Sequence, residues 1–226
     1  MSSIGRIPLK DREFPEYTEK EEKLNSWSHI FGAACALVML WVIVRATMGN
    51  PLAMTSCVVY VVSVLIMLSV SAVYHGLPKG MPKQVMRVVD HCDIFFTIAG
   101  TYTPITLLGI CPIKPVLGWT IFVIEWVLAV VGATLNAIDL KRFSKFSMAC
   151  YLGMGWCVLI SLKPALQALT WPGFLLILAG GVSYTIGAML YLIGKKRKKP
   201  YRHFIFHVFV VIAVIVQFFG VLFYLV

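Results

Sequence analysis

The sequence predicts an all-α membrane protein that folds as a bundle of seven transmembrane helices. The chain has 226 residues, of which 59% are hydrophobic, and its mean hydropathy is +0.85. Only 13% of its residues are charged, whereas a soluble domain carries roughly 25%. The apolar stretches between the charged clusters run for about 18 to 23 residues, which is enough for a helix to cross a bilayer. We expect residues 1–25 to form a cytoplasmic N-terminal segment and residues 26–226 to form a single seven-helix domain.

The apolar stretches and the residues that interrupt them define the individual helices. Pro51, Pro115 and Pro172 lie near expected helix starts, where the N–H that proline lacks would have no partner within the helix. The fifth stretch is the weakest, because Lys163 and Pro164 follow it directly. The expected spans are 27–44, 52–74, 94–110, 116–138, 147–162, 172–193 and 204–226.

The positively charged residues indicate how the helices are oriented. If the N-terminus is cytoplasmic, the outer segments carry only Arg45, Lys114 and Lys163, and the other 17 of the 20 Lys and Arg residues fall in inner segments. Short cytoplasmic loops of membrane proteins carry such an excess of positive charge. We therefore predict a cytoplasmic N-terminus and an external C-terminus, in the cell (cytoplasmic) membrane.

Several conspicuous features need no explanation beyond membrane insertion. The net charge of +10 does not indicate nucleic-acid binding, because the basic run 195–199 is explained by topology and by anionic headgroups, which attract each such charge by about 1 kcal/mol. Residues 1–25 are polar and mixed in charge, unlike a signal peptide, so the first helix is expected to be its own insertion signal. The six cysteines form no Cys-x-x-Cys pair, and we predict neither a disulfide framework nor a thiolate metal site.

The remaining polar residues gather at the inner ends of four expected helices. Ionisable groups at membrane depth are costly and are therefore functional candidates. Topology places all of these residues in the cytoplasmic leaflet, although random placement would put about half on each side. They are Glu22, Asn25 and His29 in the first span region, Ser71 and His75 in the second, Asp90, His91 and Asp93 in the third, and His203 and His207 in the seventh.

The spacing of these residues indicates a metal site. His203 and His207 are four residues apart and so share one helix face, which allows both imidazoles to bind one ion. Ser71 precedes His75 by four residues, so its hydroxyl can orient that imidazole, and Asp90 can approach as a fourth ligand or through a bound water. Three His ligands with one open position describe a catalytic zinc site. Simpler alternatives remain: each His can be an interfacial anchor, and Asp90 can favour a helix N-terminus through the helix dipole.

Four ordered stretches resemble the haemolysin III branch of the progestin and adipoQ receptor family, and the resemblance covers nearly all of the chain from Tyr17 onward. The stretch "YTEKEEKLNSWSHIFGA" resembles the opening Glu-x-x-Asn-x-x-x-His motif, and "SAVYHGLP" resembles the Ser-x-x-x-His motif. The stretch "VDHCDIFFTIAGTYTP" matches the segment that follows, and "HFIFH" supplies the final His-x-x-x-His. Four motifs in order are far more specific than any one of them.

The resemblance implies a seven-helix receptor-like protein with a cytoplasmic N-terminus and a zinc ion near the cytoplasmic face. The implied zinc ligands are His75, His203 and His207, with Asp90 contacting a metal-bound water and Ser71 beside it. The family is also grouped with membrane ceramidases, which suggests hydrolysis of a lipid amide or ester, with a lipid amide or a free fatty acid among the membrane lipids bound. The implied surrounding residues are Asp93, His29, Asn25 and Glu22. Asp93 departs from the small residue usual at its position, which leaves open which aspartate engages the water.

Two other function classes remain at this point. A non-catalytic protein of lipid homeostasis would use zinc as a clamp between helices, and it would lose stability without zinc but consume no lipid. A cytolysin would need a polar lining through the membrane, yet Glu125 is nearly alone at mid-depth. A transporter is disfavoured for the same reason, because midplane binding groups are missing.

Overall fold

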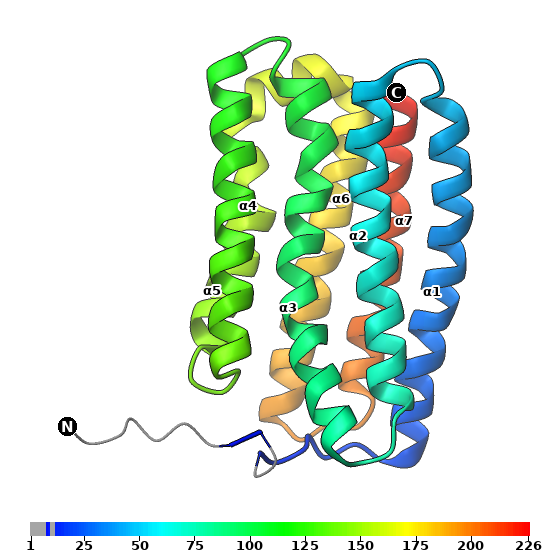
Figure 1. Ribbon diagram of the computed structural model, residues 1–226, viewed down its shortest axis with the longest axis vertical. Helices are drawn as coiled ribbons and strands as arrows, with labels where there is room; N and C mark the ends of the chain where they lie inside the picture. Colours follow the sequence, from blue (N-terminus) through cyan, green and yellow to red (C-terminus); the bar gives the residue numbers. More distant parts are fainter. Residues whose placement is uncertain (1–7, 10–11) are drawn as a thin grey trace, which may run out of the picture.

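A computed structural model describes residues 8–9 and 12–226, and all regular structure in these residues is helical. The helices pack side by side as a bundle, with the long ones roughly parallel to its long axis (Figure 1). The residues of the expected N-terminal segment at 1–7 and 10–11 lie outside the described part of the chain. The elements are α1 Glu19–Ala46, α2 Pro51–Gly76, α3 Met81–Pro104, the π-helix η2 Ile105–Ile110, α4 Pro115–Ile138, α5 Ser144–Gly155, the 3₁₀ helix η3 Cys157–Ser161, α6 Leu162–Lys196 and α7 Arg202–Tyr224.

The local sequence explains where the first helices begin. Thr18 and Glu21 form a capping box at α1, in which the Glu21 N–H donates to Thr18 Oγ1 (3.2 Å) and the Thr18 N–H donates to Glu21 Oε2 (2.9 Å). Asn50 caps α2 by accepting from the Ala53 N–H (3.1 Å). Pro51 occupies the first turn of α2, as predicted from its position.

Six helices of the described residues are long and apolar enough to cross a membrane, rather than the seven predicted. Their outer faces carry large exposed apolar side chains, such as Trp41 and Val116, as a surface in contact with lipid requires. The difference lies at the expected fifth span. The helices α5, η3 and α6 together fill Ser144–Lys196, which forms a single candidate span by length and composition.

Two interruptions explain this difference. Helix α5 has only 12 residues and passes into η3, where Tyr102 of α3 lies at the junction: its hydroxyl accepts from the Val158 N–H (2.7 Å) and donates to the Gly155 carbonyl (3.0 Å). A second break occurs at Thr170, whose φ of 58° and ψ of 173° are not helical. Figure 1 shows the chain running from α5 to the opposite end of the bundle and returning along α6. The predicted helix start near Pro172 therefore corresponds to this break inside α6.

Helix α3 begins well before its predicted apolar span. It starts at Met81 rather than near residue 94, so that Asp90 lies beyond its first turn. The effect of a helix dipole falls off within the first turn, so the dipole does not account for this aspartate. Pro104 ends the regular part of α3, and the helix continues as the π-helix η2.

Helix α1 packs closely against both α2 and α7. At Gly32 an added Cβ would lie 2.9 Å from Val211 Cγ2 and 3.2 Å from Leu68 Cδ1. Such small residues let neighbouring helices approach closely in membranes. This contact holds the middle of α1 close to both α2 and α7.

Candidate metal centre

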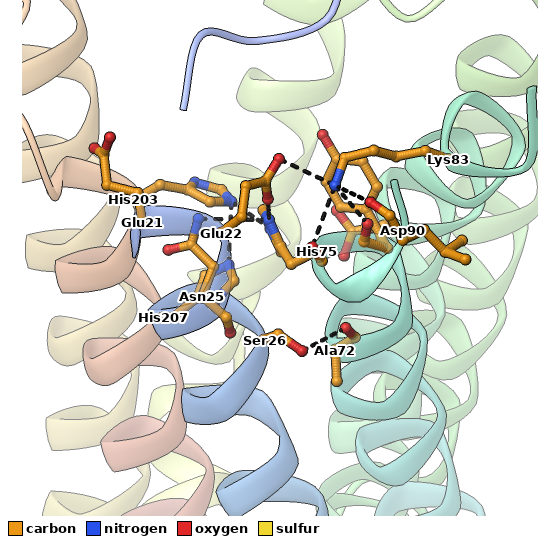
Figure 2. Close-up of polar contacts among 12 residues, drawn as sticks. Glu21, Glu22, Asn25, Ser26, Ala72, His75, Lys83, Asp90, His203 and His207 are labelled. Carbon is orange, nitrogen blue, oxygen red and sulfur yellow. Dashed lines mark hydrogen bonds and ion pairs between the residues drawn. The ribbon is translucent and has the colours of Figure 1, made fainter. Parts of the chain in front are cut away.

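Three histidine rings meet at the end of the bundle where α2 ends and α7 begins. His75 lies in the last turn of α2, and His203 and His207 lie on one face of the first turns of α7. His203 Nε2 is 3.1 Å from His75 Nε2 and 3.1 Å from His207 Nε2. The structure thus brings together the three histidines that the sequence singled out, from positions 128 residues apart (Figure 2).

The partner of His75 identifies which of its nitrogens carries a proton. Its Nδ1 lies 2.6 Å from Glu22 Oε2, and the Asn25 amide nitrogen is 3.4 Å away. Because a carboxylate can only accept, Nδ1 of neutral His75 must donate, and its Nε2 is then an unprotonated acceptor.

The same reasoning applies to His207. Its Nδ1 lies 3.1 Å from the backbone carbonyl of Asn25 and 3.3 Å from Ser28 Oγ. A carbonyl oxygen also only accepts, so Nδ1 donates and Nε2 of His207 is again an acceptor. Two acceptor nitrogens from two helices therefore point at the third ring.

The three nitrogens fit a metal ion. Acceptor atoms that converge repel one another unless a cation or a proton lies between them. Two nitrogens bound to one tetrahedral zinc ion at roughly 2.0–2.1 Å would lie about 3.3 Å apart, close to the 3.1 Å between the ring nitrogens. Neutral imidazoles whose other N–H is held by a carboxylate or a carbonyl are the usual arrangement of zinc-binding histidines. The three histidines could therefore hold a metal ion.

An ion pair between Glu22 and the buried Lys83 supports His75 on the side away from the other two histidines. Glu22 Oε1 lies 3.0 Å from Lys83 Nζ, and Lys83 also donates to the carbonyls of Tyr74 (3.0 Å), His75 (3.2 Å) and Leu77 (2.9 Å). The Lys83 side chain is 3% exposed. A basic side chain near a helix C-terminus can satisfy its last carbonyls, and here the same ammonium also fixes the carboxylate that orients His75 (Figure 2).

The acidic residues of α3 lie beside the histidines. Asp90 is buried, interacts electrostatically with His75 and His207, and lies in contact with the Ser71 hydroxyl. The Nδ1 atom of His91 is 3.5 Å from Asp90 Oδ2. Ser71 thus accompanies Asp90, whereas the hydrogen-bond partners of His75 Nδ1 come from α1.

Asp93 and His29 complete the predicted set. Asp93 interacts electrostatically with Asp90, and its buried Oδ2 has no hydrogen-bond partner among the described residues. His29 is 3% exposed and stacks flat on His207, with ring centroids 3.6 Å apart and an interplanar angle of 9°. Neither ring nitrogen of His29 has a hydrogen-bond partner in the described part of the chain, so stacking on His207 is its main contact with the site.

Sequence reasoning missed two residues of this site. Lys83 is one of the 17 Lys and Arg residues of the expected inner segments, and its position shortly after the end of α2 is the one signal in the sequence for a role in capping that helix. Tyr17 stacks on His203, with ring centroids 5.2 Å apart and an interplanar angle of 17°, and burial raises the pKa of its phenol. Only its place just before a capping box could have drawn attention to it.

Fold and site together define a helical membrane protein of several spans, with three histidines at one end of the bundle that could hold a metal ion. Residues 17–218 match the family described as haemolysin-III related. The chain belongs to this family, as the resemblance of its motifs indicated. It is 35% identical to "Hemolysin-3" of Bacillus cereus over 207 residues, which cover 91% of this chain and 92% of that protein. It is 38% identical to the "Hemolysin-3 homolog" of Bacillus subtilis (strain 168) over 211 residues, covering 92% and 96%.

Proposed function

We propose that this protein is a zinc-dependent membrane hydrolase that cleaves a lipid amide or ester. One observation carries the proposal: two histidine nitrogens that are acceptors meet a third histidine beside the buried carboxylate of Asp90. Three nitrogen donors leave one position of a tetrahedral ion open, and a neighbouring carboxylate supplies a base.

The residues of the site divide the chemistry among them. A bound zinc ion supplies a Lewis acid and lowers the pKa of water to about 7. Asp90 takes the proton of the attacking water as general base and later returns it to the leaving group. Ser71 holds the Asp90 carboxylate, and Glu22 and the Asn25 carbonyl hold His75 and His207 in the tautomers that expose Nε2.

The proposed topology places this chemistry at the cytoplasmic face of the cell membrane. The chain crosses seven times, because the break at Thr170 lets Ser144–Lys196 cross twice. The uneven distribution of Lys and Arg supports a cytoplasmic N-terminus and an external C-terminus. Membrane lipids are then the partners: an acyl chain enters from the bilayer, the basic run 195–199 attracts an anionic headgroup, and a free fatty acid is the product.

The proposal is tested with purified protein in lipid vesicles. Zinc is counted by element analysis, and the release of fatty acid from an N-acyl sphingoid lipid and from a phospholipid ester is followed by mass spectrometry. We expect one zinc per chain and turnover of one of the two lipids. Asp90→Asn should keep the zinc and lose turnover, whereas His203→Ala should lose both. Full zinc stoichiometry in His203→Ala would contradict the ligand assignment.

A structural role for zinc is the second candidate. It is favoured by the origin of the histidines, since an ion held by His75 of α2 and by two residues of α7 would tie these two helices together. Zinc removal would then lower the thermal stability of the protein, and neither lipid would be consumed. A haemolytic activity, which the names of the relatives suggest, has less physical support, because a pore needs polar lining through the membrane and the polar cluster lies at one end.

A further inference from the structure

We propose that residues 12–17 form a strap that closes the inner mouth of the histidine site, and that this strap governs exchange of the metal by holding His203 in place. Figure 1 shows the segment that leads into α1 running across the end of the bundle where α2 ends and α7 begins. The inference rests on the proposed function only in taking the three histidines as zinc ligands.

Helix α3 anchors the first half of the strap. The side-chain amide of Gln84 donates to the backbone carbonyl of Arg12, and Arg87 Nη1 donates to the carbonyl of Glu13 (2.7 Å). Gln84 is 2% exposed. Because both donors bind backbone atoms, they fix the path of the strap whatever side chains it carries.

The second half of the strap reaches helix α7. Tyr17 stacks on the His203 ring, and the Arg202 guanidinium lies 5.9 Å from the centre of the Tyr17 ring. The Tyr201 N–H donates to Glu21 Oε1 (2.8 Å), in the first turn of α1 that directly follows the strap. The strap thus extends from α3 to α7 across the site.

His203 is the histidine that most depends on this contact. The Nδ1 atoms of His75 and His207 are each held by an acceptor on α1, but Nδ1 of His203 is buried without a hydrogen-bond partner among the described residues. His203 is also less buried than the other two histidines. Its ring is therefore positioned by aromatic contacts. Tyr17 stacks on it, and the centroid of the Tyr191 ring lies 5.3 Å from the centroid of the His203 ring.

A metal site of this kind loses its ion most readily when the least firmly held ligand, here His203, moves away. When the strap lifts, the His203 ring loses its stacking partner and can rotate away, while His75 and His207 stay fixed by α1. Zinc held by two nitrogens leaves more readily than zinc held by three. The strap should therefore set the rate of metal release.

Three variants and one control test the strap. Tyr17→Ala removes the aromatic ring that stacks on His203, and Tyr17→Phe keeps it. The double variant Gln84→Ala/Arg87→Ala removes the two side chains that anchor the strap to α3 and leaves the Tyr17 ring in place. Arg142→Ala removes a cation from the loop between α4 and α5, outside the strap, and serves as a control. The first readout is the rate at which zinc passes from the protein to excess EDTA. The second is the modification of His203 by diethyl pyrocarbonate in zinc-free protein, relative to His91.

We expect Tyr17→Ala and the double variant to release zinc about threefold to tenfold faster than wild type, the range that loss of an aromatic stack gives. Tyr17→Phe and Arg142→Ala should stay within about twofold. His203 modification should rise in the same two variants. If Tyr17→Ala and the double variant both release zinc at the wild-type rate, and their His203 is modified at the wild-type rate, the proposed role of the strap is wrong. If the wild type binds no zinc, the proposed function fails, and the His203 modification, which needs no metal, still decides the strap.

Discussion

Replacing Glu22 by glutamine should weaken zinc binding without unfolding the protein. The carboxylate accepts from His75 Nδ1 at 2.6 Å and pairs with Lys83 at 3.0 Å. Glutamine keeps the shape and one acceptor oxygen but removes the charge. A hydrogen bond to a charged group contributes about 1.5–3 kcal/mol, and a neutral acceptor gives roughly half of that. The His75 contact therefore loses about 0.8–1.5 kcal/mol, which weakens zinc binding by about fourfold to tenfold.

The measurement is a competition for zinc between the protein in detergent and a chromophoric chelator. Glu19→Gln is the matched control, because Glu19 lies on the same helix but its side chain is 83% exposed and pairs with Lys23, four residues away. Exposed pairs of this kind contribute little, so the control should bind zinc as the wild type does. Equal affinities in Glu22→Gln and wild type, or an equal loss in both variants, would refute the orienting role of Glu22.

Three further outcomes follow from the packing and the topology. Tyr102→Phe removes both hydrogen bonds at the junction of α5 and η3 and should cost about 2 kcal/mol of unfolding free energy, seen as a lower Tm with unchanged zinc affinity; an unchanged Tm would show that the junction needs no cap. Gly32→Leu should destabilise the bundle by about 1–3 kcal/mol through overpacking, whereas Gly181→Leu, with no atom within 4 Å of an added Cβ, should be nearly neutral in the same thermal scan. A reporter fused after Val226 should read external, and cytoplasmic activity would reverse the proposed orientation.

The helices were predictable wherever a long apolar stretch was bounded by proline or by polar residues. Pro51 and Pro115 begin helices as expected, and the uninterrupted apolar stretches became single long helices. The prediction of seven membrane-length helices is not confirmed, because Ser144–Lys196 counts as one candidate span and is divided by a 3₁₀ segment and by the break at Thr170. The hydrogen bonds that Tyr102 makes at the first of these interruptions come from another helix, so no pattern within residues 144–196 reveals them.

The convergence of the three histidines was predictable from their spacing and from the charge asymmetry, and the structure confirms it as geometry; their role as zinc ligands stays a prediction. The supporting contacts were less accessible. Hydrophobic periodicity gives no information on the contacts of a lysine, so it does not reveal that Lys83 binds the end of α2 and Glu22. Tyr17 lies outside every apolar stretch, and only the path of the chain before α1 brings it to His203.

The separation of His75 and His203 has a consequence for biosynthesis. These residues are 128 positions apart, and ribosomes add about 5–20 residues per second, so His203 is made roughly 6–25 s after His75. During that interval Glu22, Lys83 and the last turn of α2 can assemble, since all of them precede the later histidines. The nascent chain then presents one histidine of the three until α7 enters the membrane. A chain that stops before α7 cannot complete the cluster, so metal capture would report that the last helix has been inserted.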